Sequence, residues 1–306
     1  MAKILSSSIS RVVFFLVGLL FPTSLLLAAE LTISPMFQEI EIRDEAEIAA
    51  EVLVSNTTSV EIPFRIEVYD FGSLDQSGGV AFLGASQDLQ AAYTLAPWVK
   101  VDQDRIVLAP REQKVVRVTI LNSQDLAPGG HYGALVFRST NDAALPENGI
   151  AIQQMLASLL FVNKLGGSKP AITLEQVKGE QQWFSLPKLT LDFRNSGNVH
   201  ITPRGYVELL DPFERVKAKG IINEASAIIL PDAGRLMPVV FKPQGLLWFP
   251  SWYTMKVAYR FDGDENFQFL EQKIFIFPIH SLWFIGGACL LYGSWQFFRR
   301  KRSFST

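Results

Sequence analysis

The chain has 306 residues, of which 48% are hydrophobic and 19% charged, with 28 Lys and Arg residues against 30 Asp and Glu residues. This near-neutral balance argues against nucleic acid as the main partner, because nucleic-acid-binding surfaces are strongly basic. The single cysteine, Cys289, excludes a disulfide framework, so the fold must depend on a sizeable hydrophobic core.

The N-terminal segment has the features of a secretory signal peptide. Lys3 and Arg11 supply positive charge, residues 12–27 are predominantly apolar, and two alanines precede Glu30. We predict a signal peptide over residues 1–29 and an exported protein. If the segment were not cleaved, it would act as a second membrane anchor, and the bulk of the protein would still lie on the same side of the membrane.

The stretch from residue 274 to residue 298 contains no Asp, Glu, Lys or Arg. A helix of ~25 residues, rising ~1.5 Å per residue, is long enough to cross a ~30 Å hydrocarbon layer. We therefore predict a transmembrane helix over 274–298 and a basic cytoplasmic tail over 299–306, in a single-pass protein whose bulk is extracellular. A buried core helix is the alternative. The predicted membrane-anchoring residues are Trp283, Trp295, Arg299, Arg300, Lys301 and Arg302.

β-Strand patterns dominate the first half of the central region. Apolar and polar residues alternate in short runs that are separated by Gly, Pro and polar turns, without a convincing long amphipathic helix. This pattern predicts a β-sandwich over residues 30–166. The strands that we expect there cover residues 46–54, 62–71, 98–108, 113–121, 131–138 and 150–163, with a long loop over 73–93.

A second β-rich segment follows a linker of small and polar residues that ends at Pro170. About seven strands over ~105 residues predict an immunoglobulin-like sandwich over 169–273. The expected fold class is all-β, with two tandem immunoglobulin-like β-sandwiches and one C-terminal transmembrane helix. We interpret the polar turn 195–198 as an inter-strand connection rather than a ligand loop. The expected strands cover residues 171–177, 188–194, 205–210, 220–230, 236–242, 253–261 and 267–277.

No group of residues has a spacing typical of catalysis or metal binding. The three histidines, His131, His200 and His280, are far apart and there is no cysteine partner for a structural zinc site. The acidic turn 261–267 is not a twelve-residue calcium loop, and we interpret it as solvated. No nucleophile, zincin or phosphate-loop motif occurs. We therefore predict no enzymatic activity, no cofactor and no metal.

Aromatic residues crowd around Pro250. We predict one of two roles for Trp248, Phe249 and Trp252. They contact the bilayer surface or a protein partner, or they belong to the core. For Trp98 and Tyr132 we favour the core.

The layout of the chain resembles one bacterial family. A leader precedes a β-rich segment that ends in GGHYGALVF, followed by LTLDFRNSGNVHITPRGYVEL, AIILPDAGR, an apolar stretch and a basic tail. This order is similar to that of the cell-surface proteins that interact with WxL-type wall proteins and carry an N-terminal peptidoglycan-binding domain. The resemblance implies a non-enzymatic, membrane-anchored adaptor whose first domain contacts peptidoglycan and whose second contacts a cell-surface protein. It assigns no individual contact residue.

Two other functions stay open. An envelope assembly factor similar to pilus chaperones would also have paired immunoglobulin-like domains, and a basic cleft between them would distinguish it. A cell-wall-acting enzyme would be distinguished by turnover of wall fragments. All three possibilities place the protein at the bacterial envelope without nucleic acid as a partner.

Overall fold

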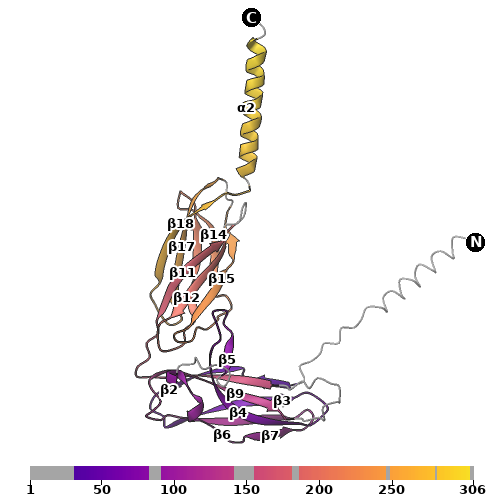
Figure 1. The fold of residues 1–306 in the computed structure, drawn as a ribbon, viewed down its shortest axis with the longest axis vertical. Coiled ribbons are helices and arrows are strands. Elements are labelled where there is room, and N and C mark those ends of the chain that lie inside the picture. Colours follow the sequence, from indigo (N-terminus) through magenta and orange to yellow (C-terminus); the bar gives the residue numbers. More distant parts are fainter. Residues whose placement is uncertain are drawn as a thin grey trace, which may run out of the picture.

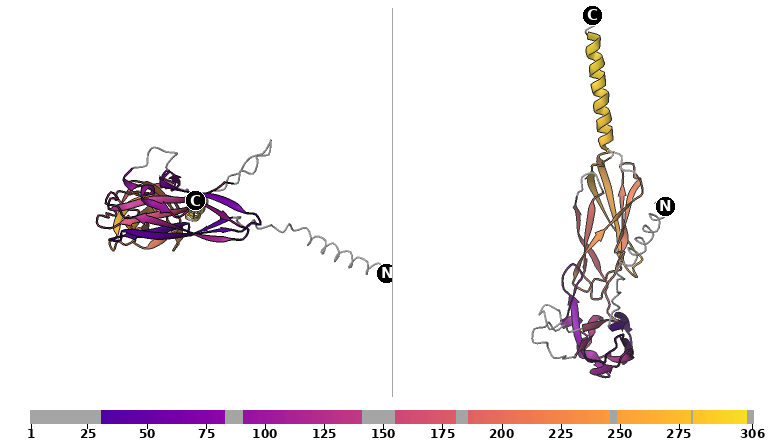
Figure 2. Two further views of the ribbon diagram at one scale, coloured as in Figure 1. Left: turned by 90° about the horizontal axis from the view of Figure 1, so that it is seen from below. Right: turned by 90° about the vertical axis from the view of Figure 1, so that its right-hand side faces the viewer.

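The structure is a computed structural model that describes residues 31–82, 91–140, 155–180, 186–245, 249–279 and 281–303. It consists of two β-sandwiches followed by one C-terminal helix, α2 (Ser281–Ser303), so the all-β fold class is confirmed. The first sandwich lies crosswise at one end of the second, and α2 extends from the opposite end (Figure 1). Figure 2 shows the same crossed arrangement, with the first sandwich seen end-on below the second.

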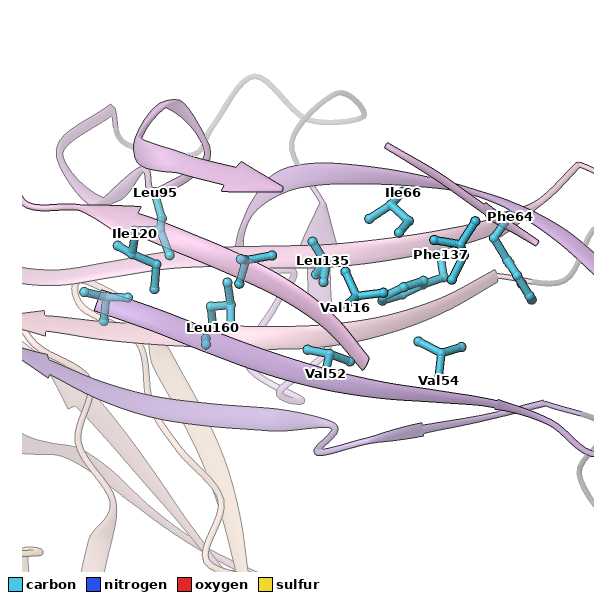
Figure 3. Close-up of a cluster of buried hydrophobic side chains, with 14 of the residues drawn as sticks. Val52, Val54, Phe64, Ile66, Leu95, Val116, Ile120, Leu135, Phe137 and Leu160 are labelled. Atoms are coloured by element: carbon cyan, nitrogen blue, oxygen red, sulfur yellow. The ribbon is translucent and has the colours of Figure 1, made fainter. Parts of the chain in front are cut away.

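The first sandwich packs a four-stranded sheet, β1-β3-β8-β6, against a six-stranded sheet, β2-β10-β9-β4-β5, in which β7 also pairs with β4. Alternate side chains of both sheets meet in one core, where Val52, Phe137 and Leu160 are almost fully buried (Figure 3). The strands are β1 (Leu31–Ser34), β2 (Phe37–Ile42), β3 (Glu47–Asn56), β4 (Ile62–Ser73), β5 (Val80–Phe82), β6 (Val99–Val101), β7 (Arg105–Leu108), β8 (Gln113–Leu121), β9 (Gly129–Ser139) and β10 (Met155–Lys164).

The second sandwich packs a three-stranded sheet, β11-β12-β15, against a five-stranded sheet, β16-β14-β13-β17-β18. Its core is separate from that of the first sandwich and contains Leu191, Phe193 and Val257. The strands are β11 (Ile172–Glu180), β12 (Lys188–Asn195), β13 (Pro203–Leu210), β14 (Val216–Ile222), β15 (Gly234–Val239), β16 (Phe241–Pro243), β17 (Ser251–Phe261) and β18 (Gln268–Ile276).

Several strands differ from their predicted extents. The run over 98–108 is two strands, because β6 pairs with β8 in one sheet and β7 pairs with β4 in the other. The predicted loop over 73–93 contains β5 and a short 3₁₀ turn. The run over 220–230 ends at Ile222, because Asn223 adopts a positive φ of 59° and its side chain accepts the N–H of Ala227.

The C-terminal region also differs from its prediction. The boundary at residue 274 is wrong, since Ile274 and Ile276 belong to β18 and pair with β17. The helix α2 continues to Ser303, beyond residue 298, where the predicted span ends. Within the described part of the chain, no helix has both the length and the apolar character needed to cross a membrane. The signal peptide predicted over 1–29 lies outside the described residues.

In each sandwich, a buried asparagine at the end of a strand forms hydrogen bonds to the backbone of neighbouring segments. It is Asn56 at the end of β3 in the first sandwich and Asn195 at the end of β12 in the second. The Nδ2 of Asn56, after β3, lies 2.7 to 3.1 Å from three backbone carbonyl oxygens. The Nδ2 of Asn195, after β12, donates to the carbonyls of Val199 (2.7 Å) and Ile229 (3.0 Å), and its Oδ1 accepts the N–H of Gly197 (2.9 Å). One side chain therefore joins the turn after the strand to a chain segment that is far away in sequence.

Replacing the buried amide should destabilise the whole protein. Asn195→Ala removes the donor to the Val199 carbonyl and the acceptor of the Gly197 N–H, and since each unsatisfied buried group costs about 1–3 kcal/mol, we expect the free energy of unfolding to fall by about 2–6 kcal/mol. Urea denaturation measures the change. Asn122→Ala is the matched control, because the Nδ2 of Asn122 also donates to a carbonyl, that of Glu45, but at an exposed site where water replaces the bond. Equal losses for the two variants would contradict this role.

Candidate functional site

The turn Asn195–Asn198 connects β12 to β13, as expected, and lies where the two sandwiches meet. The Oδ1 of Asn198 accepts the N–H of Lys169 (2.6 Å), and its Nδ2 donates to the carbonyl of Gly167 (2.9 Å). Its own carbonyl accepts the N–H of Gly130, at the start of β9 (2.8 Å). Gly197 packs so closely on the linker that a Cβ would lie 2.2 Å from the carbonyl oxygen of Lys169. This turn therefore binds both the linker and the first sandwich.

A hairpin of the first sandwich makes a second connection. The β4–β5 hairpin rises toward the second sandwich (Figure 1), and the carbonyl of Gln76 at its tip accepts the N–H of Leu236 on β15 (2.9 Å). Nearby, the Tyr93 hydroxyl donates to the Asp232 carboxylate (2.8 Å). The turn Asn195–Asn198 and the β4–β5 hairpin thus hold the two sandwiches in their crossed orientation.

An aromatic group fills the space between these connections. The ring of His200, from the second sandwich, packs against Phe161 at a centroid distance of 5.2 Å and against Tyr132 at 5.7 Å. Burial lowers the pKa of His200 below its ordinary value, because the imidazolium form is poorly solvated there, while the Glu39 carboxylate opposes this effect more weakly from 3.9 Å. His200 is thus held as a neutral ring in the junction.

A cavity of 290 Å³ lies between the sandwiches, beside these contacts. Its lining includes three carboxylates, Asp70, Asp75 and Asp232, and no Lys or Arg among the residues described. Burial and the neighbouring carboxylate of Asp232 raise the pKa of Tyr93 to about 12, which keeps its hydroxyl a donor. The basic cleft expected of an assembly factor similar to pilus chaperones is therefore not found at this cavity.

The surface of the six-stranded sheet that faces away from the core is also apolar. Strand β9 is buried at every position from Gly129 to Phe137, on both faces. Ile228 and Leu230 of the second sandwich pack on the end of this surface nearest the junction. We call this surface the outer apolar face. Its buried members are Phe71, Tyr132, Ala134, Val136 and Phe161.

Strand β10 runs along the outer apolar face. It pairs with β9 on one side over its whole length, but with β2 on the other side over only part of it. Strand β2 pairs only with residues 159–164, so that among the described residues no strand covers Met155 or Ala157 on that side. The N–H of Leu159 donates toward β2, to the carbonyl of Met36 (2.8 Å). Because backbone groups alternate in direction along a strand, those of Met155 and Ala157 point toward the same open edge. An additional strand would find hydrogen-bonding groups there.

The predicted aromatic contact residues lie elsewhere. Phe249 is 59% exposed and contacts Phe284 of α2, with ring centroids 5.2 Å apart. Trp252 is 61% exposed and contacts Phe275 of β18 at 5.6 Å. Both therefore lie at the end of the second sandwich that is remote from the junction. Trp248 lies outside the described residues.

The predicted anchor residues all belong to α2. Trp283 and Trp295 are 82% and 54% exposed, and the structure brings neither of them to the junction. Arg299, Arg300, Lys301 and Arg302 form part of the last turns of the same helix. They follow its apolar residues directly.

The ring of His131 has a structural role in the first sandwich. His131 is 2% exposed, with Nδ1 2.9 Å from the carbonyl oxygen of Thr94 and Nε2 2.7 Å from that of Ala127. Trp98 packs edge-on against its ring, and Tyr132 is buried, so both aromatic residues belong to packed interiors as expected. Within the described segments, no group of three or more His, Cys, Asp or Glu side chains is placed to hold a metal ion.

The sequence matches no protein-family model and no curated protein sequence. The fold is similar to a CFA/I fimbrial chaperone–tip adhesin complex (12% identity, TM-score 0.41, covering 80% of this chain and 98% of that one). It is also similar to the class 5 fimbrial chaperone CfaA (11%, 0.39, 81% and 100%) and to the E. coli chaperone DraB (12%, 0.36, 79% and 95%). TM-scores below 0.5 describe a distant likeness in shape only. The resemblance to the WxL-interacting family stays an expectation.

The neutral His200 makes stability depend on pH. The unfolded chain binds a proton at His200 near its ordinary pKa of 6.5, whereas the folded chain binds it only at lower pH. Stability therefore decreases as pH falls below ~6.5, by at most about 1.4 kcal/mol per pH unit. We expect His200→Gln to lose part of the decrease between pH 7.5 and pH 5.5, measured by urea denaturation at both pH values. An unchanged decrease would show that His200 is not responsible.

Proposed function

We propose that this chain is a non-enzymatic assembly factor of the bacterial envelope that captures an extended segment of a partner protein along β10. The proposal follows the alternative similar to pilus chaperones rather than the peptidoglycan adaptor. The observation that carries it is the half-paired edge of β10, where the backbone groups of Met155 and Ala157 meet no strand among the described residues. No comparable feature of the described surface favours a glycan.

Strand addition supplies affinity and selectivity by separate means. Hydrogen bonds between backbones give affinity for any extended segment, and side chains that alternate along the two strands select among them. Met155 and Ala157 occupy alternate positions of β10, next to the place that the added strand would take, and Leu159, the next in this series, already pairs with β2. A partner segment with apolar side chains at every second position would continue the outer apolar face.

Exposed apolar groups beside this edge extend the same surface. Met36 and Phe37, at the start of β2, are 70% and 55% exposed, and the Phe37 ring lies 6.4 Å from that of Phe161. Met155 is 50% exposed. These side chains would lose contact with water when a partner strand binds, which adds hydrophobic stabilisation to the backbone bonds.

The charge of the junction separates this protein from a chaperone that holds a chain terminus by its carboxylate. The cavity beside the junction contains carboxylates, which repel a second carboxylate. The register of the captured segment must therefore come from its side chains on the outer apolar face rather than from its C-terminus.

The proposal is tested with synthetic nine-residue peptides in which Val or Phe alternates with Thr. We expect binding to the full chain by fluorescence anisotropy, and loss of binding when alternate backbone nitrogens are methylated, because methylation removes the donors that a β-ladder needs. Met155→Glu should weaken binding at least ~10-fold, a change of about 1.4 kcal/mol. Val115→Glu, at a similarly exposed site on β8 in the other sheet, is the control and should bind normally.

Two results would overturn the proposal. One is equal binding of the methylated and unmethylated peptides. The other is retention of the full chain on purified insoluble peptidoglycan, undiminished by Met155→Glu, together with no peptide binding, which would restore the wall adaptor.

A further inference from the structure

Strand β18 is an unprotected edge of the five-stranded sheet. It pairs with β17 over nine residue pairs without a register shift, and among the described residues no strand covers its other side. Its sequence, QFLEQKIFI, contains no proline. Soluble proteins usually protect such edges with proline, bulges or inward charges, because an open edge pairs with other chains. The edge is long and regular, and five of its nine residues are apolar although it also carries Glu271 and Lys273, so it offers a surface for a partner strand.

The two faces of β18 differ in character. Ile274 and Ile276 point into the sandwich, which places Leu270 and Gln272 on the same inner face. The outer face carries Phe269, Glu271, Lys273 and Phe275. Two cross-strand contacts confirm this assignment: Glu271 forms an ion pair with Lys256 of β17 (3.1 Å), and Phe275 contacts Trp252.

The sequence of β18 is complementary to itself when read backwards. From residue 269 to residue 275 it reads FLEQKIF, so an antiparallel copy centred on Gln272 places an aromatic ring opposite an aromatic ring and an aliphatic side chain opposite an aliphatic one. It also places Glu271 opposite Lys273 of the partner subunit, and by symmetry Lys273 opposite the partner subunit's Glu271. Cross-strand pairs of these kinds stabilise sheets.

We infer that β18 pairs antiparallel with β18 of a second copy of this chain, centred on Gln272. The contact is two-fold symmetric and joins two five-stranded sheets into one continuous sheet. Lys256, Glu271 and the partner subunit's Lys273 then form a row of alternating charge across three neighbouring strands.

Charge selects this register over its neighbours. Moving the centre of symmetry to residue 271 places Glu271 opposite the partner subunit's Glu271, and moving it to residue 273 places Lys273 opposite the partner subunit's Lys273. Both shifts also put a phenylalanine opposite a charged side chain. Like charges directly opposite each other destabilise a sheet. A slip of one residue in the pairing would instead turn the side chains of β18 to the other face and expose Ile274.

The pairing also covers apolar surface that the single chain leaves open. Phe269 is 70% exposed and Trp252 is 61% exposed. In the dimer, Phe269 of the partner subunit lies beside Phe275, so that it extends the Trp252–Phe275 contact. On the inner face, a groove of 390 Å³ between β11 and β18 is lined by Val177, Leu189 and Ile274. The partner subunit's Leu270 lies opposite Ile274, at the rim of this groove.

Charge reversal tests the inference on the full-length chain. Lys273→Glu places a carboxylate opposite Glu271 of the partner subunit at two symmetric positions, so we expect the dimer to weaken at least ~10-fold in sedimentation equilibrium, about 1.4 kcal/mol. Glu271→Lys combined with Lys273→Glu and Lys256→Glu exchanges every charge of the row, including the partner of Glu271 on β17, and should restore the dimer. Lys242→Glu, on β16 at the other edge of the same sheet, should leave it unchanged.

Cysteine crosslinking tests the register. In a Cys289→Ser background, Gln272→Cys should form a disulfide-linked dimer, since residues opposite each other in an antiparallel pair have Cα atoms ~4.5–5.5 Å apart, within the range for a disulfide. Glu271→Cys alone should not crosslink, whereas a mixture of Glu271→Cys and Lys273→Cys chains should. A monomeric chain, a dimer insensitive to Lys273→Glu, or equal crosslinking at 271 and 272 would each overturn the inference. In those cases the β18 edge serves another partner or none.

Discussion

The hydrogen bonds of the Asn195–Asn198 turn are the constraint on which the rest of the structure depends. Asn195 faces inward and closes the second sandwich, whereas Asn198, three residues later, faces outward and holds the linker and the first sandwich. Both side chains offer donors and acceptors that match backbone groups, so the turn is at once part of a core and part of a junction. Together with the contacts of the β4–β5 hairpin and of Tyr93, it holds the crossed orientation of the two sandwiches and thereby the cavity between them.

Local pattern was sufficient to predict much of the fold. Alternation of apolar and polar residues predicted the all-β class and the full extent of β8, because a strand with one buried face carries its own periodicity. The strands over 31–42 were not identified. They are short, they divide between two sheets at Pro35, and β2 obtains its partner, β10, from a segment more than a hundred residues away.

The junction was less predictable than the strands. In the sequence, His131 and His200 each follow a turn-forming segment, and nothing there indicates that their neighbours are carbonyls and rings from other parts of the chain. A sequence pattern does not contain such long-range contacts. The charge of the cavity was unpredictable for the same reason, since its carboxylates come from segments around residues 70, 75 and 232 that only the tertiary structure brings together.

The β4–β5 hairpin couples the folding of the two sandwiches. Its tip bonds to β15, while Ile228 and Leu230 cover part of the outer apolar face in return. Separating the halves at the linker would therefore expose apolar surface on the first sandwich and leave the N–H of Leu236, on the second, without its acceptor. We therefore expect the two sandwiches to unfold together, although each has its own hydrophobic core.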